Sequence, residues 1–183
     1  MNKYGAKELA DSARTVRKNT IQIAEEIPED KYGFVAAEGA RSVEKMLTHI
    51  ALASGWQHLF HGVEKRTSFE GMDFPAIFAK FAAEEAKPRT KAEVIALLKE
   101  NGEQWATFLD GLSDEFLAQD ITMPPGATPP TKTRFEMLLS TKEHEMHHRG
   151  QLMVVQRMLG IKPHLTRRME EVIASMQAAQ ANR

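Results

Sequence analysis

Hydrophobic residues recur at intervals of three and four over most of the chain, which is the spacing of one face of an α-helix. The first such stretch runs from about Gly5 to Ile27. It stops before Pro28, because the residue that precedes a proline rarely stays helical. A second stretch covers about Ser42 to Val63. The pattern therefore predicts two long amphipathic helices in the first third of the protein.

Two capping boxes mark the beginnings of later long helices. They are Thr90-Lys91-Ala92-Glu93 and Thr133-Arg134-Phe135-Glu136, in which threonine and glutamate satisfy each other's free backbone donors. We expect one helix from about 90 to 110 and another from about 133 to 159. At 1.5 Å per residue the second would be roughly 39 Å long. A shorter helix is expected between Pro75 and Pro88, and a last one over about 165–179.

A proline-rich segment separates the last two long helices. It runs from Thr122 to Pro130 and contains four prolines, which remove backbone donors and cannot continue a helix. We expect a long crossover loop at about 122–132. No run of alternating apolar residues calls for a β-strand. The pattern predicts an all-α protein, an antiparallel four-helix bundle with extra short helices.

Composition adds limits to this picture. With 183 residues, 42% of them hydrophobic, residues 1–183 are expected to form a single domain around one core. Lys+Arg 24 nearly balance Asp+Glu 25, so no positive field indicates a nucleic-acid partner or an anionic membrane. Charged residues near the N-terminus and the lack of any window of ~20 apolar residues predict a soluble protein.

The chain contains no cysteine. Disulfides, cysteine-ligated zinc and a thiol nucleophile of the protein's own are therefore excluded, whereas histidine and carboxylate ligands remain available. A sequence of this kind fits a reducing compartment, and we expect a cytoplasmic location.

The segment His144-Glu145-Met146-His147-His148 offers the clearest chemistry. Residues four apart on a helix lie roughly 40° apart around its axis and one turn along it, so His144 and His148 can reach one ion. His144 and His148 share the inward face of their helix with Ser140, Gln151, Val155, Met158 and Leu159. Glu145 falls toward the boundary or solvent, and His147 falls at the rim.

A third inward histidine lies on the second predicted helix. His49 shares one face with Ala53, Trp56, Phe60 and Val63. His58 points roughly 180° away and His61 roughly 120° away, so neither can join His49 at one ion while the helix is continuous. A buried imidazole without a partner costs about 1–3 kcal/mol, and a shared metal would remove that cost for all three. His164 follows Pro163, where a turn or surface position is expected.

Two other metal chemistries fit the sequence less well. The segment also reads H-E-x-x-H, the zinc-protease pattern with Glu145 as base and His164, Glu170 or Glu171 as third ligand. Such proteases hold a peptide against an edge strand, and none is predicted. A di-iron site needs two Glu-x-x-His motifs, but Met46 occupies the corresponding position before His49.

The sequence resembles the DinB/YfiT-like family. Two segments carry the resemblance: Lys45-Met46-Leu47-Thr48-His49-Ile50-Ala51, and His144 to Leu152 with its H-x-x-x-H-R-G-Q pattern. The resemblance implies a four-helix bundle in which three histidines bind a divalent metal, commonly zinc or nickel. Matched residue by residue, the ligands here would be His49, His144 and His148.

The family resemblance also suggests a function. Three histidines leave at least one metal position open, as in catalytic sites. Some relatives are implied to be transferases or isomerases that use low-molecular-weight thiols such as bacillithiol or mycothiol, and others to be hydrolytic. We expect a metal-dependent enzyme acting on a small molecule, with Gln151 able to orient a ligand. The alternative is a noncatalytic metal-binding or stress-related bundle, with a homodimer interface on an outer helix face.

Overall fold

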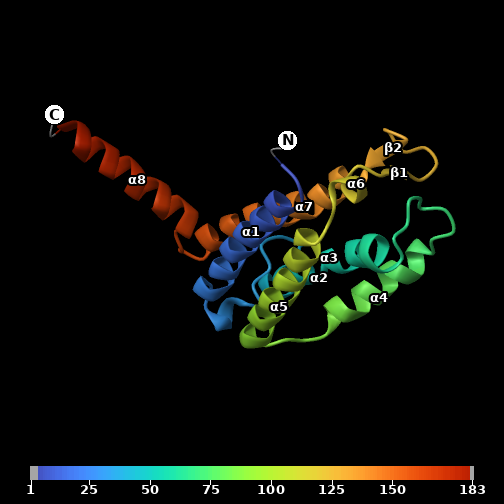
Figure 1. Ribbon diagram of the computed structural model, residues 1–183. Helices are drawn as coiled ribbons and strands as arrows, with labels where there is room; N and C mark the ends of the chain where they lie inside the picture. Colours follow the sequence, from blue (N-terminus) through green and yellow to red (C-terminus); the bar gives the residue numbers. More distant parts are fainter. Residues whose placement is uncertain (1–3, 182–183) are drawn as a thin grey trace.

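The computed structural model describes residues 4–181, and four of its helices pack together as a bundle (Figure 1). Helices α1 and α2 each contact both α5 and α7. The pairs α1 with α5 and α2 with α7 run antiparallel (Figure 1). The predicted all-α four-helix bundle is confirmed, with bounds α1 (Ala6–Glu26), α2 (Val43–Leu52), α5 (Lys91–Asp110) and α7 (Arg134–Met158).

The remaining elements are shorter or lie outside the bundle. Helix α4 packs against α2, and α8 leaves the body of the protein beside α1 (Figure 1). Their bounds are 3-10 helix η1 (Glu29–Lys31), α3 (Ser54–Gln57), π-helix η2 (His58–Val63), α4 (Phe74–Ala86), α6 (Asp114–Leu117), strands β1 (Asp120–Thr122) and β2 (Thr131–Thr133), and α8 (His164–Ala181).

Both capping boxes begin helices as predicted. Thr90 accepts from the Glu93 backbone N–H while the Glu93 carboxylate accepts from the Thr90 N–H, and the same exchange joins Thr133 to Glu136. Each helix begins at the next residue, so the free donors of its first turn are satisfied.

The main core lies between the four bundle helices. Its fully buried side chains come from all of them, and burying each aliphatic side chain contributes roughly 1.5–3 kcal/mol. They include Ile23, Leu47, Ile50, Leu98 and Leu152.

One buried guanidinium connects all four bundle helices. Arg17 on α1 donates to the carbonyl oxygens of Ile50 on α2 and Leu98 on α5, and it pairs with the Glu145 carboxylate on α7 at 2.9 Å. Gly102 leaves room for it, because a Cβ there would lie 2.6 Å from Arg17 Cγ. The contacts fix the rotation of α7, which carries two of the candidate ligands.

The second predicted helix is interrupted, contrary to the expectation of one helix to Val63. It ends at Leu52, and Ser54–Gln57 and the π-helix η2 follow. A π-turn has more residues per turn than an α-turn, so the buried face shifts along η2. His61 is therefore fully buried, whereas Val63 is 64% exposed.

The expected crossover loop is instead a hairpin. Strands β1 and β2 pair antiparallel, with Ile121 opposite Lys132, and the proline-rich segment connects them. The expectation that no strand would form was wrong. Strands of three residues with one buried side chain, Ile121, are too short to show alternation in the sequence.

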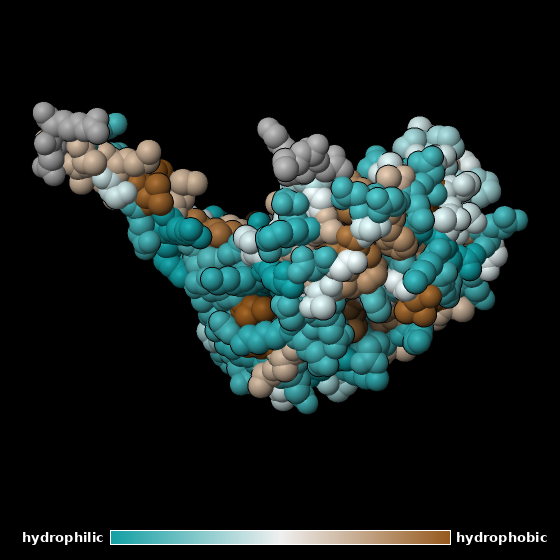
Figure 2. All heavy atoms as spheres, viewed as in Figure 1, coloured by the Kyte–Doolittle hydropathy of each residue, from teal (hydrophilic) through white to brown (hydrophobic). Residues whose placement is uncertain are grey.

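Helix α8 projects from the bundle with an apolar face exposed (Figure 2). From Arg168 to its end every described residue is exposed. The large apolar side chains among them are Met169, Val172, Ile173 and Met176. Neither α8 nor any other described helix has the length and apolar character that a bilayer crossing requires.

Candidate metal centre

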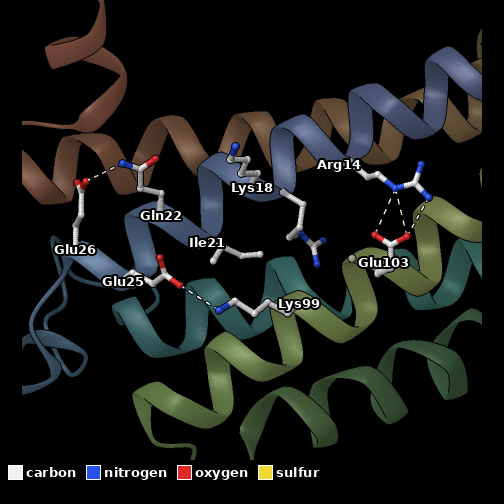
Figure 3. A pocket seen from close by; sticks show the side chains of 10 residues that line it. Arg14, Lys18, Ile21, Gln22, Glu25, Glu26, Lys99 and Glu103 are labelled. Atoms are coloured by element: carbon white, nitrogen blue, oxygen red, sulfur yellow. Dashed lines mark hydrogen bonds and ion pairs between the residues drawn. The ribbon is translucent and has the colours of Figure 1, made fainter.

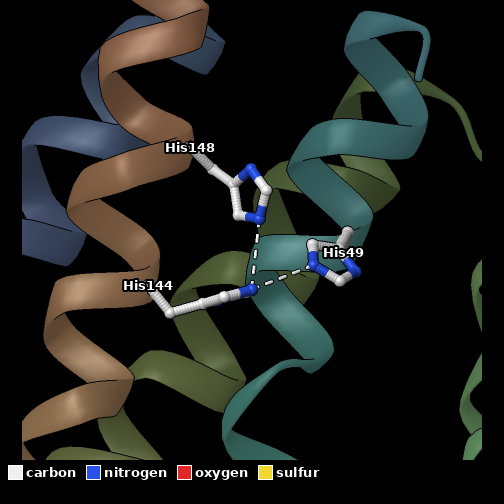
Figure 4. Close-up of side chains that lie close together, drawn as sticks. All are labelled: His49, His144 and His148. Atoms are coloured by element: carbon white, nitrogen blue, oxygen red, sulfur yellow. Dashed lines mark hydrogen bonds between the residues drawn. The ribbon is translucent and has the colours of Figure 1, made fainter. Parts of the chain in front are cut away.

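Three histidines meet between α2 and α7 (Figure 4). His49 comes from the last turn of α2, and His144 and His148 come from successive turns of α7. His144 Nε2 lies 3.1 Å from the Nε2 atoms of both His49 and His148. The three ring nitrogens are mutually within 4.8 Å. The structure thus brings together the same three residues that the sequence selected.

Hydrogen bonds on the far side of two rings fix their tautomers. His49 Nδ1 lies 2.9 Å from a Glu85 carboxylate oxygen, which can only accept, so the ring proton is on Nδ1. His148 Nδ1 lies 2.8 Å from Gln151 Oε1 and donates to it in the same way. The Nε2 atoms of His49 and His148 therefore present lone pairs to the centre of the cluster.

This arrangement suits a cation. If His144 Nε2 carries a proton, it can donate to the Nε2 atom of either His49 or His148, but not to both. The other pair of Nε2 atoms then faces each other with no proton between them. A tetrahedral zinc ion bonded to imidazoles at ~2.0–2.1 Å would space the nitrogens about 3.3 Å apart. The spacing of 3.1 Å is close to that value. A divalent ion is thus the group that this donor set fits.

The surroundings of His144 and His148 favour their uncharged forms. Burial, together with the neighbouring His148 and His49, lowers the pKa of His144 to about 4. Burial also lowers the pKa of His148, although the hydrogen bond to Gln151 opposes the shift. Neutral rings are the form that binds metal.

Glu85 contacts the histidine cluster, and sequence reasoning missed it. It lies on α4, where burial would raise its pKa, but hydrogen bonds from Arg41 and His49 outweigh burial and lower it. Lys45 holds this end of α4 by donating to the carbonyl oxygens of residues 85, 86 and 87. Periodicity cannot place α4, because none of its residues is buried.

The helical angle of Glu145 predicted a position at the boundary or in solvent, and the structure contradicts this prediction. It is buried, and both its oxygens accept from Arg17. Its carboxylate is therefore engaged in the contact that connects the bundle. The H-E-x-x-H pattern does not place a free base beside the three histidines.

The other histidines lie apart from the centre. His58 is exposed and does not join the cluster, as its angle predicted. His147 is an exposed residue, as the expected rim position implies, and its Nε2 lies 3.2 Å from the Gln151 amide nitrogen. His164 was expected in a turn or at the surface, but it is the first residue of α8 and is buried beside Asn19. Gln151 and Met158, placed on the inward face by their angles, are exposed.

His61 is buried in a separate polar contact. Its Nδ1 lies 2.7 Å from Arg134 Nη1 and must accept, since arginine only donates. Burial, assisted by the Arg134 charge, lowers the pKa of His61 to about 3. Its proton is on Nε2, the reverse of the tautomer at His49.

Two hollows in the molecule differ in their relation to the histidines. A groove of about 770 Å³ between α1 and α5 is lined mainly by charged groups that pair with each other, such as Arg14 with Glu103 and Lys99 with Glu25 (Figure 3). It contains none of the three histidines. A cavity of about 410 Å³ has His49 and His144 in its wall, and we call it the histidine cavity.

Comparison with known proteins identifies the family of this chain. The model of the DinB superfamily matches residues 13–152, a span that includes all three histidines and ends before α8. The chain belongs to the DinB superfamily.

Two proteins of Bacillus subtilis illustrate the similarity. The uncharacterized protein YjoA of strain 168 is 30% identical over 144 residues, which are 79% of this chain and 84% of YjoA. The crystal structure of YjoA, described as a DinB-like protein, aligns with a TM-score of 0.59 at 27% identity, covering 84% of this chain and 92% of YjoA.

The structure of YfiT from Bacillus subtilis also aligns. Its TM-score is 0.65 at 16% identity, covering 88% of this chain and 91% of YfiT. YfiT is described as a probable metal-dependent hydrolase with an unusual four-helix bundle topology. At this level of identity the likeness establishes the shared fold.

Proposed function

We propose that His49, His144 and His148 bind a divalent metal ion through Nε2 and that the protein is a metal-dependent enzyme acting on a small molecule. The observation that carries the proposal is the pair of fixed tautomers, which direct two lone pairs at one point beside His144. A structural bundle has no need of such an arrangement, because hydrogen-bonded histidines normally place a proton between their nitrogens.

The residues around the ligands have defined tasks in this proposal. Glu85 holds the Nδ1 proton of His49 and adds negative charge behind it, and Gln151 orients His148. Arg41 holds Glu85 in place at 2.6 Å. A bound ion would act as a Lewis acid and lower the pKa of a water or thiol at its open position.

The chemistry would be hydrolysis or transfer to a small thiol. The description of YfiT as a probable hydrolase supports the first reaction. The second requires a thiol from outside, because the chain has no cysteine. In both cases zinc and nickel are the metals we expect, since imidazole nitrogen suits both.

Metal analysis of the purified protein tests the site. We expect about one divalent ion per chain, and its loss in His49→Ala, His144→Ala and His148→Ala. His58→Ala is the matched control, because His58 is exposed and lies outside the cluster. Full metal content in all three ligand variants would exclude the site.

Binding of a thiol to the cobalt-substituted protein separates the reactions. If the enzyme uses a thiol, bacillithiol or a simple analogue should add a sulfur-to-cobalt charge-transfer band in the near ultraviolet. A spectrum that responds to hydroxide but not to thiol favours hydrolysis. An ion that responds to neither supports the alternative, a noncatalytic metal-binding bundle.

A further inference from the structure

The histidine cavity has walls of two kinds. Most of its wall is apolar and aromatic, whereas His49, His144 and Glu85 occupy one part of it. Ligand pockets commonly combine apolar walls with a few polar groups and measure ~300–1,000 Å³, and this cavity of about 410 Å³ falls in that range. The apolar side chains are Leu52, Ala53, Trp56, Phe78 and Phe81.

The aromatic side chains of the cavity come from two helices. Trp56 is on α3, whereas Phe78 and Phe81 are on α4 and point the same way as Glu85, which is four residues beyond Phe81. Gly55 lets α4 approach, since a Cβ at residue 55 would lie 2.9 Å from Phe81 Cε1. The helix that orients His49 through Glu85 therefore also supplies the aromatic wall.

Two polar atoms of the cavity residues lack partners. Gln57 Oε1 and Thr141 Oγ1 are buried, and neither has a hydrogen-bond partner among residues 4–181. Both residues are uncharged, so the wall away from the histidines favours a neutral group.

From these observations we propose that the histidine cavity binds a neutral aromatic ring of the substrate, which places the reacting polar group of that substrate at the three histidines. The inference rests on the proposed metal site and names its substrate class. Aromatic rings gain from offset and edge-to-face contacts with Trp and Phe beyond the gain from burial alone. A flexible aliphatic chain would forgo those contacts and lose more conformational freedom.

Three hydroxamates that differ only in their apolar part test the proposal on the zinc-loaded protein. Each can chelate the ion, while acetohydroxamate has a methyl group, hexanohydroxamate an aliphatic chain and benzohydroxamate a ring. We expect calorimetry to show benzohydroxamate binding at least about tenfold more tightly than either of the others. Equal affinities, or the tightest binding by hexanohydroxamate, would overturn the aromatic assignment.

Variants locate the binding. Phe81→Ala should remove most of the preference for benzohydroxamate and leave acetohydroxamate affinity within about twofold, since methyl burial there is small. Phe78→Ser, at a residue 57% exposed, tests the rim with little risk to folding. Val154→Ser is its matched control, because Val154 is 56% exposed and lies outside the cavity. A preference unchanged in Phe81→Ala and Phe78→Ser would place the ring elsewhere.

An absent metal site can be distinguished from an absent ring site. If the protein holds no metal, acetohydroxamate does not bind, and the proposed function falls. The cavity can still be examined in the metal-free Trp105→Phe variant. The chain has two tryptophans, so Trp56 is then the only one left. Benzyl alcohol should then change Trp56 fluorescence, and less so with Phe81→Ala. No response would overturn the ring site itself.

Discussion

At the scale of single residues, the partner of Nδ1 decides what each imidazole can do. An acceptor at Nδ1 leaves the Nε2 lone pair of His49 and His148 free, whereas the Arg134 donor reverses the tautomer of His61. Helix angles identified the three histidines that cluster, because these angles depend only on spacing. Helix angles could not reveal the partners of Nδ1. These are Glu85 on α4, Gln151 one turn beyond His148 on α7, and Arg134 at the beginning of α7.

Removing Glu85 should weaken metal binding without removing a ligand. We expect Glu85→Ala to lower metal affinity by about 10–100-fold, the usual effect of losing a carboxylate behind a ligating histidine. Competition with a chromophoric chelator measures the metal affinity of each variant. Glu84→Ala is the control, since Glu84 is on the same helix and binds Arg89 instead of a histidine. An equal loss in both variants would indicate a general loosening of α4.

Acid should destabilise the protein through His61. The pKa of His61 is about 3 when folded and near 6.5 when unfolded, so between these values the unfolded chain binds one more proton. The free energy of unfolding therefore falls as pH decreases from about 6.5, by up to ~1.4 kcal/mol per pH unit for this one group. Denaturant unfolding of His61→Gln should show a correspondingly shallower slope between pH 6 and pH 5. A slope identical to that of the parent protein would contradict the assignment.

At the scale of elements, helices with local signals were predictable and those without them were not. The capping boxes gave α5 and α7 to within about a residue at their beginnings, and proline marked the end of α1. The interruption of the second helix depends on burying both Phe60 and His61, which is a tertiary requirement. The angle of Glu145 was read correctly, but its burial depends on Arg17 from another helix.

Two helical glycines should respond oppositely to alanine. Gly102→Ala places a Cβ against the aliphatic part of Arg17, whose head is held on three other helices, so we expect a loss of about 1–3 kcal/mol. Gly150→Ala meets nothing within 4 Å and should stabilise α7 by about 0.5–1 kcal/mol. Thermal or urea unfolding compares them. If both substitutions raised the free energy of unfolding, the Arg17 side chain would be able to move away from a Cβ at residue 102 at little cost.

At the scale of the whole molecule, α8 stands apart from the bundle. The family match ends at residue 152, and the projecting helix follows it. Exposed apolar patches commonly mark interaction surfaces, and isolated helices of this length are marginal in water. The expected homodimer remains a prediction, and the apolar face of α8 is the surface on which we place it.

Polar substitutions on that face should separate two copies. We expect the parent protein to have the mass of a dimer and the double variant Val172→Ser with Ile173→Ser to have that of a monomer. Gln177→Ser with Gln180→Ser is the control on the same helix, at exposed polar positions. A monomeric parent protein, or a double variant that stays dimeric, would contradict this assignment.

The projection of α8 also governs how such a measurement must be made. Eighteen residues of helix extend roughly 27 Å at 1.5 Å per residue, comparable to the width of a small domain. A single copy with this arm would tumble and diffuse like a larger sphere and would elute early from a sizing column. Elution volume would then report shape as much as mass, so light scattering or sedimentation equilibrium, which depend on mass alone, must decide between one copy and two.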